Sequence, residues 1–374
     1  AEDSSIVVST DSSIDSQGRC ATIVHAVADG KSYSFTVFAV NNVGESPPSE
    51  PSTPITLTGQ KLHPLVAALN PGEICTIAGN GRKGYSGDGE PAIQAMLNEP
   101  YDVAVDELGN IFIADSGNHR IRKVSVEDMT IDTEVGTGVQ GFSGDGINPG
   151  DAQLDRPRGI DFDNLGNLYI ADRGNQRVHK VDSESQTIET VAGTGKAGNS
   201  GDGRRRRARA AELDNPESVS VDRATGRVYI AGRSKRVRMV RKSGAIHTFA
   251  GTDNGVKPEQ GGLATRVEFK NIYDDLVIAA GSGETVYIGE QNDPRLYMVS
   301  DTGIITVIAG NGTTIDGPVS EYTNEGIKAD IKPQGLAFYA GDKTIFINDG
   351  GSINLGNKCI RKFDIDSGNV VTVA

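Results

Sequence analysis

The sequence predicts an all-β protein whose larger part is a β-propeller, and three observations support this. Gly is frequent (47 of 374 residues), and short apolar runs are broken by turn residues, which favours many strands and little helix. A pair of Ala or Val with glycine recurs every 57 to 59 residues, at Gly79, Gly136, Gly193, Gly251 and Gly310. A second marker, usually acidic, recurs every 57 to 60 residues, at Asp115, Asp172, Gly232, Glu290 and Asp349. Because one such unit cannot bury both faces of its sheet, the repeat predicts blades packed around an axis.

The composition of the chain limits the classes of partner that we expect. The formal net charge is −13, and no apolar run approaches the roughly 20 residues of a membrane span, so we expect neither nucleic acid as a partner nor membrane insertion of this segment. The three cysteines are Cys20, Cys75 and Cys359. Because three is odd, at least one is expected to be free or to pair outside this sequence.

Residues 1–60 are predicted to form a small β-sandwich portion. Cys20–Ala28 and Tyr33–Asn41 alternate apolar and polar residues as strands do, with Asp29-Gly30 as the turn between them. This stretch resembles the C-terminal half of a fibronectin type III domain, and the matching residues are Gly30, Tyr33, Phe35, Val37, Ala39, Val40, Asn41, Gly44, Ser46 and Ser49. The resemblance implies a partial domain, so we expect the chain to be a segment of a longer protein. Residues 61–73 are predicted to be a linker, and residues 74–374 the propeller.

The first complete unit of the propeller follows Pro100. Four short runs rich in Val and Ile predict four antiparallel strands, at Asp102–Val105, Ile111–Ala114, Ile121–Val124 and Ile131–Val135. Leu108-Gly109-Asn110 lies where a tight turn needs residues that tolerate positive φ.

The repeated unit resembles the NHL-repeat propeller family over roughly residues 74–374. In the first blade the matching residues are Pro100, Val105, Asp106, Gly109, Asn110, Ala114, Asp115, Asn118 and Arg120. In the second they are Pro157, Gly159, Asp163, Gly166, Asn167, Tyr169, Ala171, Asp172, Asn175 and Arg177. Later blades depart from the pattern, with Gly232 and Glu290 at the acidic position and Ile272 in place of the proline.

The units do not divide evenly. The outer strand that ends a unit occurs six times, near residues 78, 135, 192, 250, 309 and 374. A complete set of three inner strands occurs only five times, beginning near residues 100, 157, 216, 272 and 333. The predicted strand Ile74–Ala78 is therefore left without a blade. Six blades are usual in the family, so we hypothesise that three further strands follow Ala374 in the intact protein and complete a sixth blade. A five-bladed ring with an extra strand is the alternative.

A polar corner recurs after the second strand of each of the first two blades. Its residues are Asp115, Asn118 and Arg120, and Asp172, Asn175 and Arg177. A carboxylate five residues before a guanidinium, across a tight turn, predicts a bidentate pair that ties the second strand to the third. Because the corner is repeated, we expect a structural role, since an enzyme places its acid in one unit.

Three Ser-Gly-Asp-Gly loops also recur, and their carboxylates are Asp88, Asp145 and Asp202. Such loops turn oxygen atoms inward, as a hard cation requires. One carboxylate per loop falls short of the six to eight oxygens of calcium, so the three would have to converge at the axis. Turn chemistry is the favoured interpretation, calcium is the weaker one, and no other cofactor is expected.

Two surface features follow. The basic run Arg204, Arg205, Arg206, Arg207 with Arg209 predicts a solvated loop, with docking of an acidic partner and proteolytic processing as alternatives. Asn311-Gly312-Thr313 is a glycan acceptor sequence, used only in a secreted protein.

We therefore expect a non-enzymatic structural or adhesion protein, extracellular or at the cell surface, whose propeller docks proteins or glycans. Copies of itself in a filament or sheath are further expected partners. Two alternatives stay open: a metal-dependent propeller lyase or hydrolase, and an intracellular NHL scaffold. The first needs histidines or carboxylates clustered at the axis, and the histidines fall at unrelated repeat positions; they are His25, His63, His119, His179 and His247.

Overall fold

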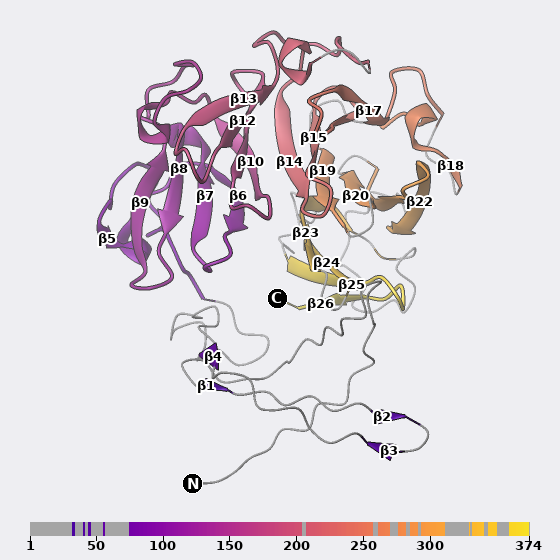
Figure 1. Ribbon diagram of the computed structural model, residues 1–374, viewed down its shortest axis with the longest axis horizontal. Helices are drawn as coiled ribbons and strands as arrows, with labels where there is room; N and C mark the ends of the chain where they lie inside the picture. The colour runs from indigo at the N-terminus through magenta and orange to yellow at the C-terminus, as the bar shows by residue number, and fades with distance from the viewer. Residues whose placement is uncertain are drawn as a thin grey trace. The chain divides into compact units, whose positions relative to one another are not determined.

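The computed structural model (Figure 1) describes most of the chain from residue 75 onward. The described residues are 75–203, 207–256, 261–269, 276–281, 285–290, 293–310, 329, 331–339, 343–349 and 359–373, and four two-residue strands nearer the N-terminus. The chain divides into two compact units, Ala1–Lys61 and Leu62–Ala374. Among the described residues no helix is long and apolar enough to cross a membrane.

The N-terminal unit is described only at its short strands. Strand β1 (Ser32–Tyr33) pairs antiparallel with β4 (Ile55–Thr56), and β2 (Val40–Asn41) pairs with β3 (Gly44–Glu45). The predicted strand over 20–28, Cys20 and the linker over 61–73 lie outside the described residues. The fibronectin III-like domain therefore stays a prediction.

The second unit holds five antiparallel sheets, which are the five blades of the predicted propeller (Figure 1). Blade 1 consists of β5 (Glu90–Pro91), β6 (Pro100–Val105), β7 (Ile111–Asp115), β8 (Arg120–Val124) and β9 (Thr130–Val135). Blade 2 consists of β10 (Pro157–Phe162), β11 (Leu168–Asp172), β12 (Arg177–Val181) and β13 (Ile188–Ala192). Blade 3 consists of β14 (Pro216–Asp222), β15 (Arg227–Gly232), β16 (Val237–Val240) and β17 (Ile246–Ala250).

Blades 4 and 5 complete the series. Blade 4 consists of β18 (Gly262–Leu263), β19 (Leu276–Ala280), β20 (Val286–Glu290), β21 (Arg295–Val299) and β22 (Ile304–Ala309). Blade 5 consists of β23 (Pro333–Tyr339), β24 (Thr344–Asp349), β25 (Cys359–Asp364) and β26 (Val370–Thr372). Five single-turn 3₁₀ helices lie among the described connections: η1 (Ala92–Gln94), η2 (Ser116–Asn118), η3 (Pro149–Asp151), η4 (Ala208–Ala210) and η5 (Ala264–Arg266).

The hairpin between the first two strands of blade 1 is fixed by its own side chains. The Asp106 carboxylate accepts hydrogen bonds from the backbone N–H groups of Leu108 and Asn110, at 3.0 and 2.8 Å. Gly109 takes φ +90°, which an L-residue rarely adopts. The arrangement repeats at Asp163 in blade 2, so the turn sequence sets the register of both hairpins.

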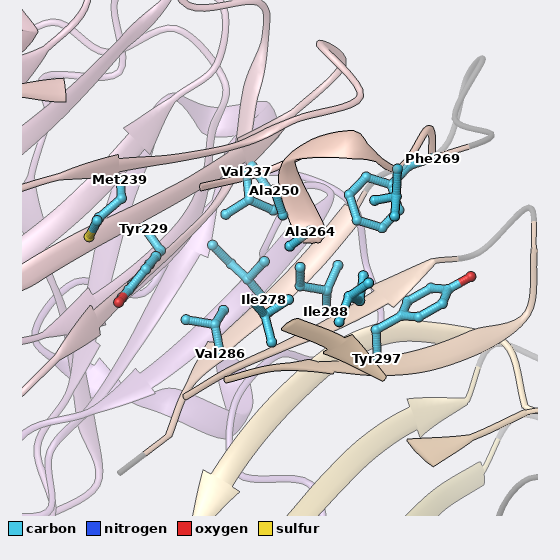
Figure 2. Close-up of a cluster of buried hydrophobic side chains, with 14 residues drawn as sticks. Tyr229, Val237, Met239, Ala250, Ala264, Phe269, Ile278, Val286, Ile288 and Tyr297 are labelled. Atoms are coloured by element: carbon cyan, nitrogen blue, oxygen red, sulfur yellow. The ribbon is translucent and has the colours of Figure 1, made fainter. Parts of the chain in front are cut away.

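Apolar side chains fill the spaces between successive blades. The ring of Phe112 in blade 1 meets that of Phe162 in blade 2 edge to face, with centroids 4.8 Å apart. Figure 2 shows the corresponding cluster between blades 3 and 4, where Tyr229 and Val237 meet Ile278 and Ile288. Each blade thus buries a face that it could not bury alone.

The outer face of blade 1 is not covered in this way. Val103 and Val105 of β6 are 62% and 47% exposed, whereas their repeat equivalents Ile160 and Phe162 are buried. At the other end of the series Phe346 of blade 5 is 36% exposed, although its equivalents in the other blades are buried. The five described blades therefore leave one apolar face open at each end.

The prediction of a strand over Ile74–Ala78 is wrong for residues 75–78, which have no strand assignment. They do occupy the position of an outer strand, because Gly79 donates to the Ala92 carbonyl as Gly136 donates to that of Pro149. A strand needs a neighbour to share its ladder, and none of the described strands lies beside it. The sixth blade stays a hypothesis.

Candidate functional site

The repeated acidic corner joins a loop to a turn. One Asp115 oxygen accepts a hydrogen bond from the Asn98 backbone N–H, and the other from the Asn118 side chain, both at 2.7 Å. In blade 2, Asp172 accepts from the Asp155 backbone N–H at 2.7 Å and from Asn175 at 2.6 Å. Both carboxylates are fully buried, which fits a structural role for the corner.

The predicted bidentate pair between Asp115 and Arg120 is not formed. Arg120 donates to the carbonyls of Asn118 and Thr137, and its guanidinium carbon lies 3.9 Å from the Tyr85 ring centroid. Donors of the loop (Asn98) and of the turn (Asn118) already occupy both carboxylate oxygens, and the aromatic ring of Tyr85 offers the guanidinium a face.

The same correction holds in blade 2. There Arg177 donates to the carbonyls of Asn175 and Thr194, at 3.1 and 3.0 Å, and covers the Phe142 ring. The second strand is tied to the third by other residues.

The corner acid has a further polar partner on the third strand, seven residues after the acid in blades 1, 2 and 4, at a position that the sequence analysis missed. Arg122 lies 3.5 Å from Asp115, His179 lies 3.1 Å from Asp172, and the Tyr297 hydroxyl lies 3.3 Å from Glu290. In blade 5 the pair is Arg361 with Asp349, at 2.7 Å, where an insertion lengthens the spacing. Alignment of the repeats beyond Arg120 would have shown a polar side chain in the third strand of each blade.

The Ser-Gly-Asp-Gly loops lie against the outer strands, so their aspartates do not converge at the axis. Asp88 pairs with Arg122 at 2.6 Å. Asp145 and Asp202 accept the backbone N–H groups of Thr190 and Thr248, at 2.8 and 3.0 Å. Within the part of the chain that the structure describes, no group of three His, Cys, Asp or Glu residues could hold a metal ion.

The basic run is described only from Arg207 onward, and Arg204, Arg205 and Arg206 lie outside the described residues. Arg209 pairs with Glu189 at 2.8 Å and with Asp145 at 3.5 Å, and its side chain is half exposed. Asn311 also lies outside the described residues. Cys75 and Cys359 are free thiols.

A second unpredicted cluster joins blades 2 and 3 near the start of their first strands. Glu217 of β14 is fully buried and lies 2.8 Å from Arg158 and 2.8 Å from Arg173, which both belong to blade 2. Arg233 of blade 3 lies 3.4 Å from the same carboxylate. An acid that gathers guanidinium groups from two blades links the blades.

The innermost strands are joined by carboxylates as well. Asp102 of β6 accepts the Ile160 backbone N–H at 2.9 Å, and Asp161 of β10 accepts that of Val221 at 2.7 Å. Burial raises the pKa of Asp102 to about 6 and also raises that of Asp161. These acids hold neighbouring blades together by backbone contacts.

An open groove lies between blades 1 and 2 at the hairpin ends of their strands. Its volume is about 440 Å³, and Phe112, Phe162, Leu168 and Val181 are among the residues that line it. Leu108 and Leu165, at the tips of equivalent hairpins, also line it and are each 72% exposed. Two exposed leucines beside an aromatic floor form an accessible apolar surface.

The groove lining is acidic. Asp106, Glu107 and Glu134 bring three carboxylates, and Lys123 brings one ammonium group. Lys123 lies 3.9 Å from Glu134 and 5.5 Å from the Phe112 ring centroid. The groove thus combines an apolar floor with a charged lining, as polypeptide-binding surfaces do.

Comparison with known families supports the repeat. Residues 97–124 and 154–181 match the NHL repeat family. These segments run from just before the first strand to the end of the third strand in blades 1 and 2. Blades 1 and 2 therefore match the NHL repeat, and the fold of the chain is a five-bladed propeller.

Two relatives show how the chain compares with longer proteins. It is 26% identical over 303 residues to Protein SUPPRESSOR OF QUENCHING 1, chloroplastic, of Arabidopsis thaliana, and the matched region covers 77% of this chain and 27% of the relative. It is 30% identical over 143 residues to NHL repeat-containing protein 2 of Bos taurus, and the matched region covers 35% of this chain and 19% of the relative. The chain thus spans about a quarter or less of either relative.

Among solved structures, one similar fold is a structural genomics protein of unknown function from Bacteroides thetaiotaomicron. The TM-score is 0.54 at 17% sequence identity, and the match covers 80% of this chain and 63% of that one. At this identity the likeness concerns the fold alone.

Proposed function

We propose that this chain is a non-enzymatic binding module, and that its propeller docks a segment of a partner polypeptide in the groove between blades 1 and 2. The observation that carries the proposal is the pair of exposed leucines, Leu108 and Leu165, beside an open groove of about 440 Å³. Exposed apolar surface of this kind marks interaction sites on soluble proteins.

The repeated polar groups support the same proposal. The carboxylates of the corners and of the outer loops are held by backbone N–H groups, amides and guanidinium groups of the fold, as at Asp115, Asp172 and Asp202. Side chains engaged in this way stabilise the blades. The groove, in contrast, combines two exposed leucines at equivalent hairpin tips with Phe112 and Glu134, which are not repeated in blade 2.

An extracellular or cell-surface location is the second part of the proposal. It rests on the fibronectin III-like sequence pattern and on the acceptor sequence at Asn311. Glycan mapping of the native protein tests it: an occupied Asn311 is the expected result, and an unmodified Asn311 in protein recovered from inside the cell contradicts it.

The docking function is tested by selecting peptides that bind the 374-residue chain from a phage-displayed library of random octapeptides. Each enriched clone is then tested on Leu108→Asp/Leu165→Asp, which places charge in the groove. The matched control is Val139→Asp, because Val139 is exposed on the loop after β9 and does not line the groove.

The proposal predicts clones that lose binding to the double variant and keep it on the control. Enrichment of clones that bind both variants equally contradicts docking in the groove. Turnover of a lactone or glycoside substrate that survives both substitutions would favour the enzyme alternative.

A further inference from the structure

We propose that the segment that docks in this groove carries a basic side chain between apolar ones. This inference rests on the proposed docking function and names the chemistry of its partner. It is argued from the charges that line the groove, from the place that Lys123 already occupies, and from the residues that set this groove apart from the next blade boundary.

The charges of the groove favour a cationic segment. Its lining carries three carboxylates and one ammonium group, and Asp106 is held by its own hairpin, so Glu107 and Glu134 are the acids left for a partner. Glu107 is exposed, and the side chain of Glu134 is 36% exposed. Charge complementarity at the edge of an interface steers the encounter and excludes segments of like charge, so an acidic segment is disfavoured here.

Lys123 shows how a basic group is accommodated. Its ammonium group lies between the Glu134 carboxylate and the face of Phe112, at 3.9 and 5.5 Å. A cation held between a carboxylate and an aromatic ring uses both ion pairing and cation–π attraction. An arginine of the partner would find the same two groups, and it would compete with Lys123 for them.

The apolar floor fits the flanking side chains of the segment. Phe112 and Phe162 meet edge to face at 4.8 Å, and Leu108 and Leu165 stand at the hairpin tips. In an extended segment, alternate side chains point to the same side, so two apolar side chains on one face can contact this surface while the residue between them reaches the edge.

The site is not repeated at the boundary between blades 2 and 3. There the position of Phe112 is Tyr169, whose hydroxyl lies 3.2 Å from Asp163, and the position of Leu165 is Ala224. Lys180, the equivalent of Lys123, pairs instead with Asp182 at 2.7 Å. A side-chain set that departs from the repeat is expected where a blade serves binding.

The test measures binding of the fluorescein-labelled peptide Gly-Leu-Arg-Leu-Gly to the 374-residue chain by fluorescence anisotropy. Two matched peptides replace the arginine with glutamine or with glutamate. The proteins are wild type, Glu107→Gln/Glu134→Gln, Lys123→Gln and Leu165→Asp, each checked for an unchanged unfolding midpoint.

The arginine peptide should bind about tenfold more tightly than the glutamate peptide, and the double glutamine variant should remove most of that difference. Lys123→Gln should tighten binding of the arginine peptide about threefold, because it removes the competing cation. General damage to the groove would weaken binding instead, so this variant separates the two effects.

Equal binding of the three peptides, with loss on Leu165→Asp, would overturn the basic segment and leave docking in the groove intact. If Leu165→Asp leaves binding of the peptides unchanged, both the basic segment and docking in the groove are overturned. Absence of binding by all three peptides at about 1 mM, where a complex with a Kd of about 0.1 mM is about nine-tenths formed, would also overturn the inference.

Discussion

The carboxylate of Glu217 accepts a hydrogen bond from Nε of Arg173 at 2.8 Å, across the boundary between blades 3 and 2. Arg158 reaches the other oxygen of Glu217 at 2.8 Å. The contact depends on the acid being buried, since removal of water strengthens the attraction between opposite charges. Adjacent blades are therefore joined by charge as well as by apolar packing.

Glu217→Gln should lower the free energy of unfolding by about 2 kcal/mol, because Glu217 is buried and the variant leaves the partly buried guanidinium groups of Arg158 and Arg173 without their carboxylate. Urea unfolding followed by circular dichroism measures the change. The matched control is Glu99→Gln, which removes an exposed carboxylate from Lys83 and should leave the midpoint nearly unchanged. Equal midpoints for the two variants would contradict the account.

A double-mutant cycle tests the new partner of Arg120. Arg120→Lys keeps the charge but loses the planar stack on Tyr85, so coupling with Tyr85→Leu should be about 1 kcal/mol. Coupling with Asp115→Asn should be below about 0.5 kcal/mol, since no direct pair exists. Unfolding free energies of the six proteins provide both values, and a larger coupling with Asp115 would restore the pair expected from the sequence.

The Asp102 carboxyl should give stability a measurable pH dependence. Its pKa is raised by burial to about 6, so the folded chain holds the proton more tightly than the unfolded chain does. The stabilising contribution of the Asp102 carboxyl to the free energy of unfolding is fully present below about pH 4 and is lost as the pH rises through about 6. The loss is at most about 3 kcal/mol.

Asp102→Asn cannot titrate, so the difference between wild type and this variant isolates the carboxyl. Urea midpoints at several values between pH 4 and pH 7 should shift in favour of the variant as the pH rises. A difference that stays constant with pH would show that the Asp102 pKa is not raised in the folded chain.

The propeller architecture could be predicted from the sequence because the residues that determine it are close together in the chain and are repeated. The triplet Leu108-Gly109-Asn110 with Asp106 builds one hairpin, and the same chemistry at Asp163 builds the next. The strands of blade 1 lie within two residues of their predicted bounds. The short strand β5 was missed, because its two residues pair with β9 directly after a glycine-rich loop.

The functional surfaces could not be predicted in the same way, because they depend on residues distant in sequence. Phe112 and Phe162 meet only when two blades pack, and Glu217 lies 44 positions from Arg173. Arg120 turns to a carbonyl 17 positions away instead of to the nearby acid. Repeats predict what each blade shares, whereas the Glu217 cluster and the groove residues Phe112 and Glu134 depend on what the blades do not share.

The open face of blade 1 predicts an asymmetry between equivalent residues. Val103→Lys should change the free energy of unfolding by less than about 0.5 kcal/mol, because Val103 is 62% exposed in this chain. Ile160→Lys, at the buried equivalent position of blade 2, should cost more than about 3 kcal/mol. Thermal or urea unfolding distinguishes them, and a large cost at Val103 would show that another segment covers this face.

Hydrogen–deuterium exchange of the 374-residue chain, with and without a selected groove-binding peptide, tests the docking function most directly. The account predicts slower exchange at the two hairpin tips, residues 106–108 and 164–166, because these residues line the groove. Exchange in the loops at residues 86–89 and 143–146 should not change. Protection confined to those loops, or to the open face of blade 1, would contradict the groove as the docking site.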